Sequence, residues 1–335
     1  MSTRSPIVGL AVIIVLILGT LGATAAPRLD TVRVFFLPAG GYGALFIAER
    51  EGYFARQQIK ATWVPLRSVV DEIPLLLQGQ LEVGGGSPTP ALFNAVARGE
   101  PLRIVADLGH VAGRGNWASL IVRKDLAGAV KSVADLRGRR VVNPSGTGSF
   151  AEFAMAKILA TVGMSVNELQ LVNIPPPAIL AALQNGSVDA SVLPPPLDTQ
   201  AVETGIGFKL LYFDDYFQGE HVRFLFFGRT LLEQNRALGL RVMVAYLQAL
   251  QRYNEGPTPR NVGIISEYLK VPPEIVRKSG WTAIYPDGFV DVTGLRRYQD
   301  WLYDLDLVTV RNPVSRLADA SFRERAKELL GIAGR

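Results

Sequence analysis

The sequence predicts an α/β protein built of two domains that are joined by crossover strands. Three observations support this prediction. The chain has 335 residues, a length typical of about two domains. Hydrophobic residues make up 48% of the chain and charged residues 19%, which supplies two cores and excludes a disordered chain. Short β-branched runs alternate with single helices, and this alternation predicts right-handed crossovers and largely parallel sheets.

The first third after Pro27 shows this alternation most clearly. Residues 31–37 (TVRVFFL) are β-branched and aromatic, as a buried strand requires, and a glycine-rich turn separates them from the first helix. By the same criteria the expected strands are 31–37, 61–64, 81–85 and 103–108, and the expected helices are 44–56, 69–78 and 88–98.

The middle third repeats the pattern, and the last third becomes helical. The expected strands are 118–122, 140–143, 169–173 and 188–193, with helices at 132–135, 149–161 and 178–184. Further helices are expected at 231–253, 261–269, 273–279, 292–305 and 321–330. Because no flexible linker is visible, segments 117–122 and 222–227 are the candidate crossovers. We therefore predict one domain from 28–116 plus 223–335 and a second from 117–222.

The N-terminus has the three parts of a secretory signal. A basic residue, Arg4, precedes an apolar run at 7–21, and small residues follow at 23–25 before Pro27. The alternative is a membrane anchor, but the apolar run has 15 residues, whereas a spanning helix needs roughly 20. We predict that residues 1–25 are cleaved and that the mature chain is a soluble, exported, periplasmic protein.

Composition excludes several classes of function. The formal net charge of +5 is spread along the chain without a basic stripe, which argues against nucleic-acid binding. Cysteine is absent, so disulfides, thiolate nucleophiles and cysteine metal sites are excluded. His110 and His221 are the only histidines, and neither a G-x-S-x-G elbow nor an H-E-x-x-H pattern occurs. We expect no enzyme, no cofactor and no metal, and a structural or cleft hydrogen-bonding role for His110.

Three glycine-rich turns between a strand and a helix outline a candidate polar cleft, since ligands of open α/β sheets bind at the carboxyl ends of the strands. They are 38–43, 84–89 and 143–149. Each turn alone is explained by tight-turn geometry, and Ser149 with Glu152 is explained by helix capping. Arg67 and Ser68 are candidate anion partners, Pro194–Pro196 with Asp198 form a candidate stiff wall, and the candidate cleft aromatics are Trp117, Tyr42, Phe150 and Phe217.

Several segments in a fixed order resemble the substrate-binding proteins of ABC importers, in the nitrate/sulfonate/taurine and thiamine-precursor (NMT1-like) family. They are GALFIAEREGYF at 43–54, LLLQGQLEVG at 75–84, ADLRGRRVV at 134–142, GTG at 146–148 and AALQNGSVDA at 181–190. The similarity covers roughly residues 30–331. Two positions depart from the family pattern: Glu82 replaces the usual Asp, and Pro194–Pro196 replace a loop that often carries an aromatic or acidic residue. Both departures bear on the ligand more than on the fold.

The resemblance implies a type II periplasmic-binding-protein fold, in which two doubly wound α/β domains enclose an interdomain ligand cleft. The binding residues that it implies, together with Trp117, are Gly40, Gly41, Tyr42, Arg67, Ser68, Gly86, Ser87, Thr89, Ser145, Gly146, Thr147, Gly148, Ser149, Pro195 and Asp198. It also implies hinge closure around a solute, followed by docking onto membrane permease subunits that a separate ATPase drives. We expect a monomer.

The leading expectation for the ligand is a small anion such as a sulfonate, nitrate or taurine-like solute, or else a heteroaromatic solute. Glycine turns and helix N-termini favour the anion. Two alternatives keep the same fold: a binder of thiamine-type pyrimidine precursors, and a sensor module that presents its ligand to a receptor. The fungal pyrimidine synthases that resemble this family need a cysteine-rich motif, which this chain lacks.

Overall fold

The computed structural model describes residues 29–37, 39–66 and 69–333. The predicted signal at 1–25 and the candidate residues Arg67 and Ser68 lie outside these residues. Over the described ranges, no helix is long and apolar enough to cross a membrane. Within the same ranges, no cluster of three or more His, Asp or Glu side chains could hold a metal ion.

The first sheet, called sheet A, contains the strands from both ends of the chain. Its order is β2-β1-β3-β10-β4, with β1 at Asp30–Phe36, β2 at Ile59–Pro65, β3 at Val83–Gly86, β4 at Arg103–His110 and β10 at His221–Phe227. Strand β1 runs parallel to β2 and β3, whereas β10 runs antiparallel to both β3 and β4. We call sheet A and its helices lobe A.

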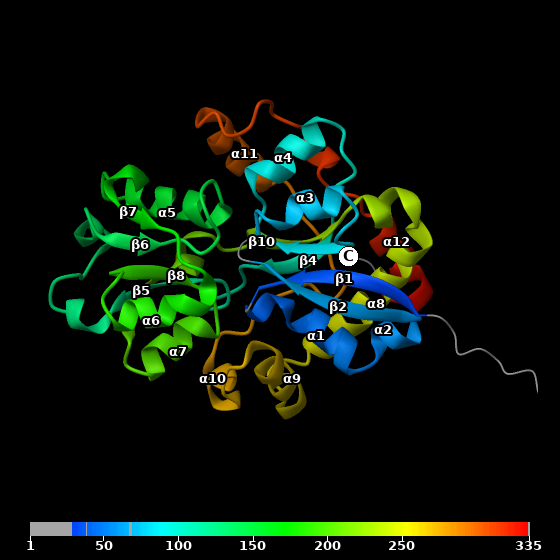
Figure 1. Cartoon of the computed structure of the whole chain (residues 1–335), viewed down its shortest axis with the longest axis horizontal. Coiled ribbons are helices and arrows are strands. Elements are labelled where there is room, and N and C mark those ends of the chain that lie inside the picture. The colour runs from blue at the N-terminus through cyan, green and yellow to red at the C-terminus, as the bar shows by residue number, and fades with distance from the viewer. Residues whose placement is uncertain (1–28, 38, 67–68, 334–335) are drawn as a thin grey trace, which may run out of the picture.

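The second sheet, called sheet B, comes from the middle of the chain. Its order is β7-β6-β8-β5-β9, with β5 at Ser119–Arg123, β6 at Arg140–Val142, β7 at Gln170–Val172, β8 at Ala190–Leu193 and β9 at Gly207–Tyr212. Its helices are α5 at Phe150–Ala160, α6 at Ile179–Gln184 and α7 at Leu197–Glu203. Figure 1 shows α5 on one side of this sheet and α6 and α7 on the other. We call sheet B and its helices lobe B.

The two sheets confirm the predicted α/β fold class, and each sheet is largely parallel as predicted: four of its five strands run in the same direction and one is antiparallel. Each sheet is mixed, because the chain crosses between the lobes twice and each crossing ends in an antiparallel strand, β5 in sheet B and β10 in sheet A. The candidate crossovers are therefore strands inside the sheets, and the connections between the lobes are the segments 111–118 and 213–220. The predicted domain boundaries stay predictions.

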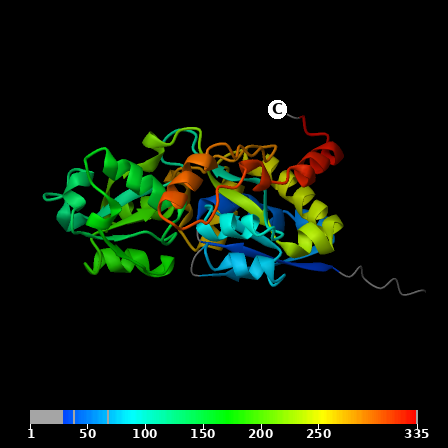
Figure 2. The same ribbon diagram turned by 90° about the horizontal axis from the view of Figure 1, so that it is seen from above.

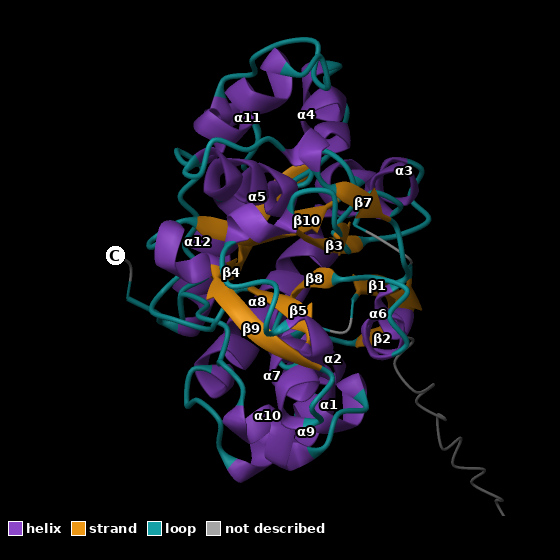
Figure 3. Cartoon of the chain, turned by 90° about the vertical axis from the view of Figure 1, so that its left-hand side faces the viewer, coloured by secondary structure: helices purple, strands orange, loops and turns teal. Residues whose placement is uncertain are grey.

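The remaining helices cover sheet A and reach towards lobe B. Helices α1 (Gly43–Arg50), α2 (Tyr53–Arg56), α8 (Arg236–Tyr253) and α12 (Ser321–Leu330) pack together, while α3 (Glu72–Leu77) contacts β3 and α4 (Pro90–Ala97) follows it. Helix α9 (Pro259–Leu269) packs on α1, α10 (Pro273–Lys278) contacts α7 of lobe B, and α11 (Leu295–Asp304) contacts α5 of lobe B. The lobes lie side by side along the long axis in Figure 2, and helices surround the strands in Figure 3.

Two expected helices are interrupted. The expected helix 44–56 is divided into α1 and α2 at Gly52, whose φ of 73° is left-handed and favours glycine. The expected helix 231–253 begins with a π-helical turn at Thr230–Gln234, and α8 starts anew after Asn235, whose side chain caps it by accepting from the N–H of Leu238.

Each sheet contains the same kind of ion pair, between an arginine and a carboxylate. In sheet A, Glu82 accepts a hydrogen bond from the backbone N–H of Arg33 at 2.7 Å and pairs with its guanidinium. In sheet B, Asp189 accepts from the backbone N–H of Arg140 at 2.9 Å and pairs with that guanidinium at 2.9 Å. Glu82 therefore joins the start of β3 to β1. The expectation that this departure from the family pattern bears on the ligand is not supported, since Glu82 does not line the cavity described below.

Both histidines share one buried carboxylate in lobe A. Asp107 is fully buried, and its Oδ2 lies 2.9 Å from His110 Nδ1, while His221 Nδ1 lies 3.4 Å from Oδ1. Burial opposes ionisation, but the two imidazoles hold the pKa of Asp107 below its usual value. Since His110 ends β4 and His221 begins β10, this cluster joins the two strands where the chain enters and leaves the interlobe connections.

Candidate ligand-binding site

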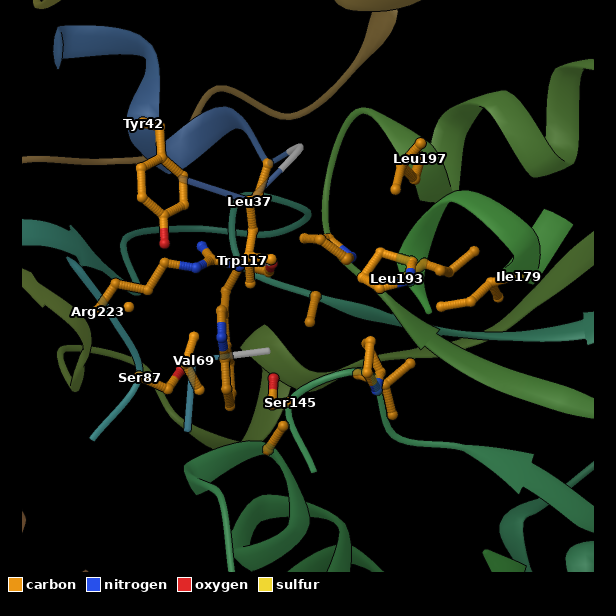
Figure 4. Close-up of a pocket in the computed structure, with 18 residues that line it drawn as sticks. Leu37, Tyr42, Val69, Ser87, Trp117, Ser145, Ile179, Leu193, Leu197 and Arg223 are labelled. Atoms are coloured by element: carbon orange, nitrogen blue, oxygen red, sulfur yellow. Dashed lines mark hydrogen bonds between the residues drawn. The ribbon is translucent and has the colours of Figure 1, made fainter. Parts of the chain in front are cut away.

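A cavity lies between the lobes and is lined from both of them (Figure 4). Its empty space, including the part open to solvent, is about 680 Å³. The loop after β1, the end of β3, the interlobe connection and β10 contribute residues from one side, while the loops after β6, β7 and β8 contribute from the other. The lining residues are Leu37, Ala39, Tyr42, Val69, Gly86, Ser87, Trp117, Ala118, Pro144, Ser145, Ala151, Pro176, Ile179, Val192, Leu193, Pro194, Leu197 and Arg223.

Arg223 supplies a positive charge to the cavity wall. The residue is buried, and its Nη2 donates to the carbonyl of Trp117 at 3.3 Å, while Nη1 has no hydrogen-bond partner. Burial lowers the pKa of Arg223 below its usual value, and nearby Tyr42 and Asp214 oppose this shift. A guanidinium nevertheless stays protonated in proteins. Because Arg223 forms no ion pair with a carboxylate in the described part of the chain, the wall presents a buried cation with a free donor.

The stem of Arg223 runs between two glycines that leave room for it. A Cβ added to Gly41 would lie 3.2 Å from Arg223 Cδ, and one added to Gly109 would lie 3.5 Å from Arg223 Cβ. Gly41 also approaches the carbonyl of Leu108 closely. These contacts explain why the sequence has glycine at position 41: the residue makes space for the arginine.

The hydroxyl groups beside Arg223 already have acceptors within the protein. Tyr42 donates to the carbonyl of Gly85, and Ser87 donates to the carbonyl of Val222 at 2.9 Å. Burial, helped by the nearby Glu72 and opposed by Arg223, raises the pKa of Tyr42 well above 10.0. Ser145 is different, since its hydroxyl has no hydrogen bond among the described residues and it lines the cavity from lobe B.

Glu72 is a buried acid behind this end of the cavity. It is fully buried; its Oε2 accepts from the N–H of Gly85 at 2.9 Å, and Oε1 has no partner. Burial raises the pKa of Glu72 well above its usual 4.5, although the bond from Gly85 opposes this. The raised pKa favours the protonated, uncharged form of this carboxyl, which repels an anion near Tyr42 and Arg223 less than a carboxylate would.

We predict that Glu72 makes folding stability fall as pH rises. The unfolded chain loses this proton at about pH 4.3, whereas the folded chain keeps it, so each pH unit between the two pKa values lowers the unfolding free energy by about 1.4 kcal/mol. Glu72→Gln removes this dependence, so in urea unfolding the variant should gain stability relative to the parent as the pH rises above about 5. Parallel pH profiles for the two proteins would show that Glu72 is ionised in the folded state.

The opposite end of the cavity is apolar. Ile179, Leu193 and Leu197 come from lobe B, and Figure 4 shows them across the cavity from Tyr42, Ser87 and Arg223. Ile179 and Leu193 belong to the core cluster of sheet B, against which Leu197 also packs. The apolar end is thus an extension of the lobe B core, so its shape is held by packing.

The lobes touch each other around the cavity. The N–H of Gly40 in lobe A donates to the carbonyl of Pro195 in lobe B at 3.1 Å. Tyr298 of α11 places its hydroxyl within hydrogen-bond distance of Gly148 O in lobe B and 3.0 Å from Pro88 O in lobe A. A further contact joins Lys278 of α10 to Glu203 of α7.

The predicted site residues fall into several groups. Tyr42, Ser87, Trp117 and Ser145 line the cavity together with Gly86. Others lie beside it in the contacts just described, namely Gly40, Gly41, Gly148 and Pro195. Gly146 and Thr147 instead line a separate hollow with Asn143 and Leu171.

The remaining predicted residues have partners within the protein or face elsewhere. Ser149 caps α5 by accepting from the N–H of Glu152 at 3.3 Å, which is the capping role that the sequence left open. Asp198 is buried and accepts from Lys209 Nζ and Ser119 Oγ, both at 2.8 Å. Thr89 stands at the N-terminus of α4 with a buried, unpartnered Oγ1, but it does not line the cavity.

Arg223 is the residue that sequence reasoning missed. It lies in β10, His221–Phe227, of which the sequence predicts 222–227 as a crossover. A signal was present, because an arginine inside an otherwise apolar and aromatic strand is unusual: burying it requires a reason.

Comparison with known proteins agrees with this geometry. Residues 41–258, more than half of the chain, match the family described as NMT1/THI5 like. The taurine-binding periplasmic protein of Escherichia coli is 26% identical over 146 residues, which cover 43% of this chain and 42% of that protein. In the curated relatives that it matches, the aligned part of the chain spans less than half their length.

Solved structures share the fold over nearly the whole chain. The alkanesulfonate-binding protein SsuA from Xanthomonas axonopodis pv. citri, bound to MOPS, has a TM-score of 0.69 at 21% identity, covering 88% of this chain and 99% of its own. The nitrate-binding protein NrtA from Synechocystis PCC 6803 has a TM-score of 0.73 at 15% identity, with coverages of 92% and 91%. The desulfurization enzyme DSZB also shares the fold, with a TM-score of 0.61 at 16% identity and coverages of 90% and 99%. The match over residues 41–258 shows that the chain belongs to the NMT1/THI5-like family.

Proposed function

We propose that the protein is the solute-binding component of an ABC importer and captures a small anion between its two lobes. The observation that carries this proposal is Arg223, a buried cation on the cavity wall with a free Nη1 donor and no carboxylate partner among the described residues. A buried charge without a partner is costly in free energy, so an anion bound beside it gains both the charge and the hydrogen bond.

Both lobes take part in binding. Tyr42, Ser87 and Arg223 face the ligand from lobe A, and Ser145 with the apolar wall faces it from lobe B; Trp117 lies in the connection between the lobes. A ligand that touches both lobes favours the closed form by its differential affinity for that form. Gly40, Gly148 and Pro195 lie in contacts between the lobes that help to hold the closed form.

The transport setting follows from the family. The taurine-, sulfonate- and nitrate-binding proteins similar to this chain are named as binding proteins, and the taurine-binding relative is named as periplasmic. We propose that residues 1–25 direct export to the periplasm, that the closed protein docks as a monomer onto a permease powered by a separate ATPase, and that the protein catalyses no reaction.

A thermal-shift panel of sulfonates, carboxylates, nitrate and thiamine-type pyrimidines tests the proposal on the purified protein. An anion present at about 100 times its dissociation constant should add about 2.7 kcal/mol to the unfolding free energy. A saturable shift with an anion is the expected result. A shift with a pyrimidine and with no anion would overturn the proposed ligand class.

A further inference from the structure

We propose that the ligand is a monoanion on a compact apolar body that carries no ammonium group. This inference rests on the proposed function and specifies its substrate class. It follows from how charge, hydrogen-bonding groups and apolar surface are distributed over the cavity wall, as Figure 4 shows.

The charge on the described part of the cavity wall is positive. Among the described lining residues, Arg223 is the only one with a charged side chain, and none is acidic. The acids nearby have other partners. Glu72 accepts from the N–H of Gly85, and burial raises its pKa and so favours its uncharged form. Asp198 pairs with Lys209, and Asp214 accepts from the backbone N–H groups of Asn116 and Trp117. An ammonium group on the ligand would lose its hydration without gaining a counter-charge, at a cost of several kcal/mol.

Among the described lining residues, few side chains offer a free hydrogen-bond donor to a neutral polar solute. The hydroxyl protons of Tyr42 and Ser87 already go to backbone carbonyls, which leaves Ser145 as the lining hydroxyl with its proton free. A sugar or polyol would bury several hydroxyl groups against this wall without partners. An anion needs only the Arg223 donor and the Ser145 hydroxyl.

The apolar end of the cavity requires a ligand that carries an apolar group. Ile179, Leu193 and Leu197 face the cavity opposite Arg223, and burying an apolar group against them is worth about 25 cal/mol per Å². Nitrate has no apolar part, so it would leave this end of the cavity without a partner. The wall therefore selects an anion whose charged group meets lobe A and whose apolar body meets lobe B.

Two matched pairs of ligands test this class by calorimetric titration. Taurine and 1-propanesulfonate differ by an ammonium in place of a methyl group, and β-alanine and butyrate differ in the same way. We expect 1-propanesulfonate to bind at least about tenfold more tightly than taurine, and butyrate to bind at least about tenfold more tightly than β-alanine. Nitrate should bind more weakly than 1-propanesulfonate and more weakly than butyrate. The sulfonate and carboxylate arms also report which anionic group the site prefers.

A substitution at the apolar end should reverse the preference. Leu197 is half-buried and is the first residue of α7, where an aspartate suits the helix dipole. Leu197→Asp should favour taurine over 1-propanesulfonate, while Leu197→Asn, which has nearly the same shape without the charge, should weaken both ligands without reversing their order.

The outcomes separate the two proposals. Equal affinities within both pairs, or tighter binding of the zwitterions, would overturn the apolar-body inference while the proposed anion-binding function stands. Failure of 1-propanesulfonate, butyrate and nitrate to bind at all would overturn both.

Discussion

Replacing Arg223 by Met is expected to weaken the binding of every anionic ligand by at least about 30-fold, equivalent to about 2 kcal/mol. Arg223 is the only charged side chain among the described residues that line the cavity, and its Nη1 is free to donate. Met keeps an unbranched apolar stem in the slot beside Gly41 and removes only the charged end. Calorimetric titration of the parent and the variant with the same anion measures the loss.

The same substitution should leave the unliganded protein at least as stable as the parent. A buried charge without a partner is destabilising, so its removal should not lower the midpoint of urea unfolding. Arg325→Met is the matched control, because it removes the same charge from an exposed position on α12. Two results would contradict a ligand-binding role of Arg223. One is that Arg223→Met binds anions as tightly as the control; the other is that it loses binding only because it unfolds.

Gly148→Ala should hold the lobes apart and weaken binding by about tenfold or more. Gly148 has a φ of 73°, and a Cβ there would lie 2.7 Å from Pro90 Cγ, which belongs to the opposite lobe. The methyl group therefore collides with lobe A only when the lobes are closed, so the open form escapes the collision. Small-angle X-ray scattering in the presence of ligand should show a larger radius of gyration than the parent shows.

Gly138→Ala separates this effect from backbone strain. Gly138 has a similar φ of 70°, but a Cβ there meets nothing within 4 Å. Both variants should lose roughly 1 to 2 kcal/mol of stability from the left-handed backbone, and only Gly148→Ala should also lose affinity. Equal affinities of the two variants would mean that the contact between Gly148 and Pro90 does not govern closure.

The fold class could be predicted because strand-like segments alternate with segments of helical periodicity, and turn residues separate them. The strand predicted at 31–37 appears as β1 at Asp30–Phe36, and the helix predicted at 149–161 appears as α5 at Phe150–Ala160 with Ser149 as its cap. Here the local sequence and the tertiary environment favour the same structure.

The reversed direction of the crossover strand β10 could not be predicted, because it depends on where the chain returns and not on local propensity. Apart from Arg223, the run Val222–Phe227 is apolar and aromatic like a buried parallel strand, yet it enters sheet A between β3 and β4 from the other lobe and is antiparallel to both. Strand β9 at Gly207–Tyr212 was not predicted. Its Lys209 interrupts the apolar run, and that residue is accommodated only by its pairing with Asp198, 11 positions earlier in the chain.

The candidate ligand site could be predicted from the sequence only in part. Glycine-rich turns mark the ends of strands, and from them the sequence predicts Tyr42, Ser87 and Ser145 as binding residues; all three line the cavity. Whether a polar residue in such a turn faces a ligand or a protein partner depends on residues distant in sequence. Asp198 has Lys209 and Ser119 as partners, whereas Arg223, inside a strand and remote from any turn, has none at Nη1.

A crystal structure of the protein with 1-propanesulfonate tests the central claim most directly. We expect one ligand between the lobes, with a sulfonate oxygen within hydrogen-bond distance of Arg223 Nη1. The propyl group should lie against Ile179, Leu193 and Leu197. A ligand bound outside this cavity, or one whose sulfonate lies at the lobe B end away from Arg223, would contradict this claim.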